Sequence, residues 1–91
     1  MTYVDIKNMT KRIDDIKAML GVEENEELLR ELDELYIKRA DAISSIPEQT
    51  QEGACLLMHL RYGYTWRKIA TIVGGGNSAN GIIKKCTRFE W

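Results

Sequence analysis

Between residues 61 and 86 the chain reads RYGYTWRKIATIVGGGNSANGIIKKC. A short stretch over 65–73 has its apolar residues at helical spacing, and the glycines 74–76 follow it. A basic stretch over 78–89 comes next, with Ile82, Cys86 and Phe89 spaced to share one face of a helix. A helix, a tight turn and a second, basic helix predict a helix-turn-helix, whose second helix enters the major groove of DNA.

Upstream of this stretch, the sequence predicts two amphipathic helices, over 2–20 and 23–45, separated near Gly21. The apolar positions of the first form a heptad stripe: Ile6, Met9, Ile13, Ile16 and Leu20. Arg39 interrupts the apolar stripe of the second helix. The stripe consists of Leu28, Leu32, Leu35, Ala42 and Ile46. Whether these helices pair within one chain or between chains stays open at this stage.

Pro47 predicts the start of a third helix, over 47–62, because proline suits the first turn of a helix. We expect its inner face to carry Ala54, Leu57 and Leu60, and Gly53 to weaken it slightly. The predicted class is therefore all-α. Residues 1–46 are predicted to form a coiled-coil-like helical hairpin or an oligomerisation segment, and residues 47–91 a three-helix helix-turn-helix unit that binds DNA.

The charge of the chain is divided between its two halves. Residues 1–52 carry seven Lys or Arg against thirteen Asp or Glu, a net of −6, and residues 53–91 carry six against one, a net of +5. Such asymmetry indicates a polyanionic partner for the basic half. The alternative is that the two halves attract each other.

The second helix of the motif begins with small polar residues, which let its backbone approach a duplex. Asn80 is able to pair with adenine in bidentate fashion, and Asn77 or Ser78 is expected to cap this helix. Arg67 and Lys68 open the helix before the turn and suit phosphate contacts. The residues predicted to bind DNA are Arg67, Lys68, Asn77, Ser78, Asn80, Lys84, Lys85 and Arg88.

Nothing in the sequence predicts catalysis, a metal or another cofactor. His59 is the only histidine and is expected to be structural, and Trp66 is expected to anchor the core. Cys55 and Cys86 form no CxxC motif and are expected to be reduced and semi-buried. No apolar run approaches a membrane-spanning length, so we expect no membrane contact and a cytoplasmic location.

Leu60-Arg61-Tyr62, followed by Thr65-Trp66-Arg67-Lys68-Ile69-Ala70, resembles the region-four helix-turn-helix of bacterial sigma factors, which reads the promoter −35 element. The segment is similar to late-transcription regulators of Gram-positive phages and mobile elements, of the ArpU and RinA type. The resemblance covers residues 47–90 and implies double-stranded DNA as partner. No residue marks a contact with RNA polymerase, the other partner of the sigma family, so that partner stays open. The turn over 74–78 is longer than the family's, and Gly81 replaces a helix-favouring position.

The function expected from these features is sequence-specific DNA binding by a transcriptional regulator. A small-terminase-type packaging factor and a protein-interaction adaptor are the alternatives. A dimer joined through residues 1–46 is favoured, because two reading helices would address half-sites about 34 Å apart.

Overall fold

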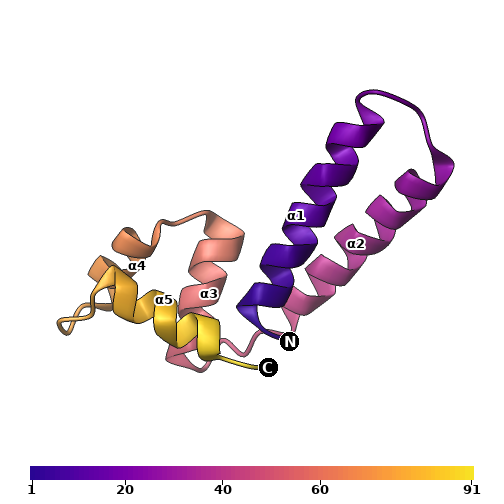
Figure 1. Ribbon diagram of the computed structural model, residues 1–91. Helices are drawn as coiled ribbons and strands as arrows, with labels where there is room; N and C mark the ends of the chain where they lie inside the picture. Colours follow the sequence, from indigo (N-terminus) through magenta and orange to yellow (C-terminus); the bar gives the residue numbers. More distant parts are fainter.

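The computed structural model describes all 91 residues and consists of five helices without strands, which confirms the all-α prediction. The helices are α1 (Tyr3–Leu20), α2 (Glu26–Ser44), α3 (Gln51–Tyr62), α4 (Trp66–Val73) and α5 (Ala79–Arg88). Helices α1 and α2 form an antiparallel hairpin, and α3, α4 and α5 gather beside its base (Figure 1). None of the five combines the length and the apolar character that crossing a lipid bilayer requires.

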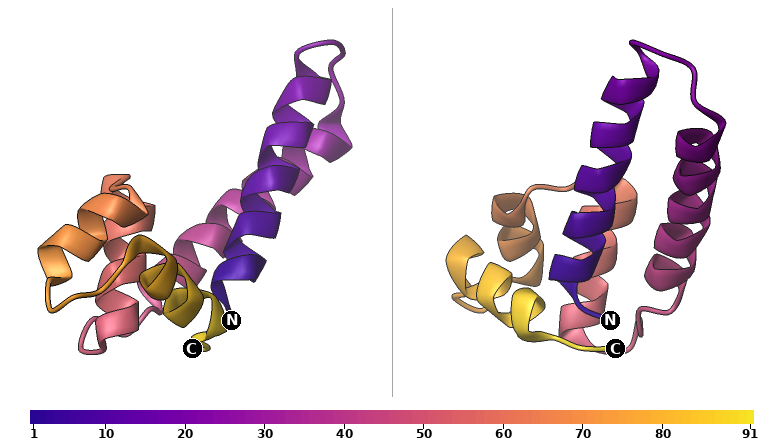
Figure 2. Two further views of the ribbon diagram at one scale, coloured as in Figure 1. Left: turned by 60° about the vertical axis from the view of Figure 1, so that its left-hand side comes forward. Right: turned by 45° about the vertical axis from the view of Figure 1, so that its right-hand side comes forward.

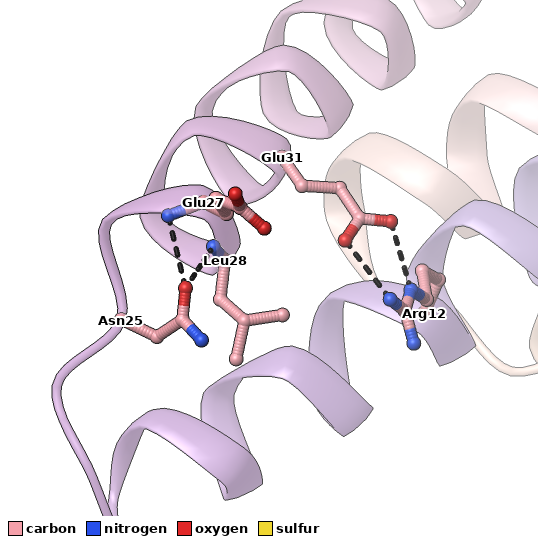
Figure 3. Close-up of polar contacts among 5 residues, drawn as sticks. All are labelled: Arg12, Asn25, Glu27, Leu28 and Glu31. Carbon is pink, nitrogen blue, oxygen red and sulfur yellow. Dashed lines mark hydrogen bonds and ion pairs between the residues drawn. The ribbon is translucent and has the colours of Figure 1, made fainter.

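The hairpin closes within one chain, which answers the question left open by the two heptad stripes. Ile6, Ile13 and Ile16 are buried along α1, as its stripe predicts. On the exposed side, the guanidinium of Arg12 donates two hydrogen bonds to the carboxylate of Glu31, at 3.0 and 2.9 Å (Figure 3). This pair joins the two helices and lowers the pKa of Glu31 through its hydrogen bond and charge.

Two helices begin later than predicted, because their caps lie farther along the chain. Asn25 accepts hydrogen bonds from the backbone N–H groups of Glu27 and Leu28, so α2 begins at residue 26 rather than 23 (Figure 3). The prediction that helix α3 begins at Pro47 was wrong, because the helix begins at Gln51. Instead the Thr50 hydroxyl donates to the Pro47 carbonyl and accepts from the Gly53 N–H, which makes Thr50 the N-cap.

The inner face of α3 was predicted only in part. Leu57 is buried as expected, but the most deeply buried side chains are Cys55 and Leu56, while Ala54 and Leu60 are half-buried. Gly53 is also buried, and a Cβ built on it would lie 1.8 Å from the Pro47 carbonyl oxygen. The glycine therefore permits a close approach of the 47–50 turn, a role that the sequence analysis did not predict.

One apolar core joins the base of the hairpin to the three-helix unit. Its members come from all five helices and from the link after α2: Tyr3, Ile6, Ala42, Ile43, Ile46, Cys55, Leu56, Leu57, Ile69, Ala70, Ile82 and Cys86. The chain ends complete this junction, since the Trp91 N–H donates to the Met1 carbonyl at 2.9 Å. The Trp91 indole N–H also donates to the Ala42 carbonyl, at 3.0 Å. The N- and C-termini accordingly lie side by side in every view (Figures 1 and 2).

Candidate nucleic-acid interface

The outward face of α5 carries a row of polar and basic side chains. Asn80, Lys84 and Arg88 are four residues apart and all exposed, whereas Ile82 and Cys86 on the opposite face are buried. Phe89, predicted to face inward, is half-buried against the core. The amphipathic pattern of this helix thus holds in the structure, with the amide and the cations open to an approaching ligand.

The turn before α5 is built from three glycines in left-handed backbone conformations. Gly74, Gly75 and Gly76 have φ values of 67°, 66° and 79°, a region that other residues enter only with strain. The Asn77 amide donates to the Gly74 carbonyl at 2.8 Å and accepts from the Lys85 ammonium at 3.5 Å. The turn geometry therefore depends on the glycines and on this half-buried amide.

Of the two candidate caps for α5, Ser78 is the one used. Its hydroxyl accepts from the Gly81 N–H at 3.0 Å, and Ala79 then begins the helix. Asn77 and Ser78 were both predicted to bind DNA, yet the contacts of both side chains are local ones that shape the turn and the cap. Asn80, one residue into the helix, points outward and has no such contact.

The start of α4 supplies a second group of exposed cations. The Thr65 hydroxyl accepts from the Lys68 N–H at 3.1 Å and caps the helix. Arg67 and Lys68 are exposed in its first turn, and the Lys68 ammonium lies 4.0 Å from the centre of the Tyr64 ring. The cation is thereby held over an aromatic face at the corner between α3 and α4.

These cations are not neutralised within the chain. The two ion pairs of the structure are Arg12–Glu31 and Arg61–Glu48, the latter at 3.7 Å. The other basic residues of the C-terminal half are exposed and have no carboxylate within 4.0 Å. They are Arg67, Lys68, Lys84, Lys85 and Arg88.

An aromatic cluster connects the start of α4 to α3 and to α1. The rings of His59 and Trp66 stack with centroids 4.1 Å apart, and Tyr3 meets Trp66 edge-on at 5.6 Å. A carbonyl only accepts hydrogen bonds, so Nδ1 of His59 donates to the Tyr64 carbonyl, at 2.8 Å. In the neutral ring Nε2 then accepts from the Tyr3 hydroxyl, 3.2 Å away. Trp66 packs against the core as predicted, and both ring nitrogens of His59 have structural partners.

The two thiols, Cys55 on α3 and Cys86 on α5, are free and buried. Burial raises the pKa of Cys55, and burial together with the neighbouring Cys55 and Glu52 raises the pKa of Cys86 to about 12. Both thiols therefore stay protonated near neutral pH. They are more deeply buried than the predicted semi-buried state, because both side chains belong to the apolar core that all five helices share.

The sequence did not predict a groove of about 390 Å³ between the hairpin and the end of α3. The groove lies beside Arg39, and the guanidinium Nε of Arg39 donates to the Thr10 hydroxyl at 2.8 Å. The one feature of the sequence that could have indicated the groove is that Arg39 interrupts an apolar stripe. All buried side-chain nitrogen and oxygen atoms of the chain have hydrogen-bond partners, and no three metal-binding side chains cluster. The groove is lined by Tyr3, Ile6, Lys7, Thr10, Lys11, Asp14, Arg39, His59 and Leu60.

Comparisons of the chain with protein-family models, with curated proteins and with solved structures found no match. The side chains of the interface are therefore the basis for inferring which kind of ligand it binds. Exposed hydrogen-bond donors and unpaired cations on one helix, flanked by more cations on the helix before it, suit a polymer with a regular array of negative charges.

Proposed function

We propose that the protein is a sequence-specific double-stranded DNA-binding protein, a transcriptional regulator of a phage or mobile element. In this proposal α5 lies in the major groove, which is wide enough to admit a helix. The protein acts in the cytoplasm as a homo-oligomer joined through residues 1–46, and it catalyses no reaction. RNA polymerase stays open as a second partner.

One observation carries the proposal: the outward face of α5 combines an amide with cations that no carboxylate of the chain neutralises. Cations alone support only sequence-independent attraction to phosphates. The amide of Asn80, exposed near the helix start, adds a group that distinguishes one base from another. The resemblance of residues 60–70 to sigma region four supports the same use of the two helices.

The roles within the interface follow from these placements. Asn80 reads a base edge, while Lys84, Lys85 and Arg88 contact phosphates along the groove. Arg67 and Lys68 bind the flanking backbone and fix the register of α5. Asn77 and Ser78 hold the turn and the helix start, and so orient Asn80 without having to touch a base.

The test is a selection from random-sequence duplexes with the purified full chain, at about 150 mM salt, where weak surface attraction is screened. Enrichment of a defined motif is expected, with two half-sites if the oligomer is a symmetric dimer. The control is the variant Lys84→Glu/Lys85→Glu, which should enrich nothing. A pool that stays random with the native chain refutes the proposal and favours the adaptor alternative, and particles of ring-sized mass would favour the packaging factor.

A further inference from the structure

The groove between the hairpin and the end of α3 is lined by more cations than anions. Lys7 and Lys11 of α1 and Arg39 of α2 line it, and Asp14 is the one carboxylate among its lining residues. None of these four side chains takes part in an ion pair of the chain. The groove thus carries two more positive charges than negative ones, although residues 1–52 as a whole carry thirteen Asp or Glu against seven Lys or Arg.

Arg39 is held in a fixed orientation at the wall of this groove. It is half-buried, at the step of an apolar stripe between Leu35 and Ala42. Its Nε donates to the Thr10 hydroxyl at 2.8 Å, and this hydroxyl donates in turn to the Ile6 carbonyl at 3.0 Å. The terminal nitrogens of the guanidinium make no hydrogen bond within the chain, and they are not enclosed, because no buried nitrogen lacks a partner. Their N–H groups are therefore available to an acceptor in the groove.

The rest of the groove combines a second cation site with an apolar lining. Lys7 and Lys11 are exposed one turn apart on α1, and the Lys7 ammonium lies 5.6 Å from the centre of the Tyr3 ring. Tyr3, Ile6 and Leu60 provide the apolar lining. The volume of about 390 Å³ falls in the range of small-molecule sites, about 300–1,000 Å³. The groove accordingly suits a small molecule with an anionic end and an apolar body.

We propose that this groove binds a small phosphate monoester. The phosphoryl group lies against the guanidinium of Arg39, whose planar fork matches two phosphoryl oxygens, and the ammonium groups of Lys7 and Lys11 surround it. The body of the molecule packs on Tyr3 and Leu60. A phosphate monoester carries close to two negative charges near neutral pH, which equals the excess of positive charge in the groove, whereas a carboxylate carries one.

The proposal goes beyond the DNA-binding function and does not depend on it, because the site shares no residue with the interface on α4 and α5. The phosphodiester of a DNA backbone carries only one charge per phosphate and is part of a duplex too large for a groove of this volume. A short duplex is nevertheless included in the test, so that DNA and a free monoester are distinguished as the source of the phosphoryl group.

The first experiment is an NMR titration of the full chain with phenyl phosphate and with inorganic phosphate, at constant ionic strength maintained with chloride. Both probes should shift the Nε–H signal of Arg39 in a saturable way and leave that of Arg30, which is exposed elsewhere on α2, unchanged. Phenyl phosphate should bind about threefold or more tightly than inorganic phosphate, because its ring buries apolar surface. No saturable shift with either probe, or a shift with a 12-base-pair duplex alone, overturns the proposal.

Variants test the cations of the site, with the shift of the Thr10 backbone N–H signal as readout. Arg39→Leu should weaken phenyl phosphate binding about tenfold or more, since charge-assisted hydrogen bonds are lost, and leucine continues the apolar stripe of α2. Arg30→Leu is the matched control on the same helix and should bind like the native chain. Lys7→Ala/Lys11→Ala changes only exposed positions and should also weaken binding about tenfold. Native affinity in Arg39→Leu or in the lysine variant refutes the site, and circular dichroism will verify that each variant keeps its helices.

Discussion

The Tyr3 hydroxyl lies 3.2 Å from Nε2 of His59 and so connects the first turn of the hairpin to the last turns of α3. His59 in turn stacks on Trp66, at the first position of α4. The position of α4 relative to the hairpin therefore depends in part on a polar contact among aromatic rings.

Replacing Tyr3 by Phe keeps the ring and removes this hydrogen bond. We expect the free energy of unfolding to fall by about 1 kcal/mol, the usual contribution of one partly buried hydrogen bond. Urea denaturation will measure the change. The control is Tyr62→Phe, because the Tyr62 side chain is 68% exposed at the end of α3, and equal stability losses in both variants would contradict the role of the Tyr3–His59 contact.

Gly53→Ala should destabilise the protein although alanine favours helices. The added methyl group would meet the Pro47 carbonyl oxygen, so the 47–50 turn must shift, at a cost of about 1–3 kcal/mol. Gly81→Ala is a matched control in the first turns of α5, where the nearest atom to the added Cβ is the Ser78 hydroxyl oxygen at 3.2 Å. Thermal denaturation compares the two, and a Gly53→Ala variant as stable as the native chain would disprove the close approach.

Lys84→Ala/Lys85→Ala should weaken binding to every duplex and reduce the slope of log affinity against log salt by about two, since two phosphate contacts are lost. Fluorescence anisotropy at several salt concentrations gives the slope. The matched control is Lys11→Ala/Lys38→Ala, which removes two exposed cations from the hairpin. Equal effects of the two double variants would show that general charge, and not α5, governs binding.

Asn80→Ala should act differently from the lysine variant. We expect a loss of about 1–3 kcal/mol on the preferred duplex at a single base pair, with little change on unrelated duplexes, because a base contact carries sequence information. Competition binding with one-base-substituted duplexes identifies that pair. A uniform loss across all sequences would show that Asn80 contacts only the backbone.

The stability of the protein should decline as the pH rises above about 9. The ordinary thiol pKa is 9.0, and burial raises the pKa of Cys86 to about 12 in the folded chain. The unfolded chain therefore releases this proton first, so the stabilisation is complete below pH 9 and is lost between pH 9 and 12. Urea denaturation at pH 8 and pH 10 tests this, with Cys86→Ala as comparison. If both proteins lose equal stability between these pH values, the thiol plays no part.

Periodic patterns made most of the fold predictable. The heptad stripe of α1 and the apolar positions of α4 and α5 identify residues that are buried or half-buried, because one face of each helix meets the core. The predicted starts of α2 and α3 were wrong, because Asn25 and Thr50 cap these helices farther along the chain than the predicted first residues, 23 and 47. A cap depends on a single side-chain hydrogen bond, which spacing alone does not reveal.

The candidate interface was predictable in composition but not in detail. The structure aligns Asn80, Lys84 and Arg88 on one exposed face. The sequence predicted only the inward face of that helix, from the spacing of Ile82, Cys86 and Phe89. It did not separate Asn77, which closes the glycine turn, from Asn80, which faces outward. The close neighbours of Gly53 and the Tyr3–His59 contact were also beyond prediction, since both join segments that only the tertiary fold brings together.

The pairing of residues 1 and 91 has a mechanical consequence. The base of the hairpin is joined to the rest of the molecule by the link after α2, by the shared apolar core, and by the hydrogen bonds between Met1 and Trp91. A helical hairpin joined to a domain at a single point is free to rotate about that point, whereas several contacts around the junction oppose such rotation. A load applied at the hairpin tip is therefore delivered to the end of α5, the helix that we place in the groove.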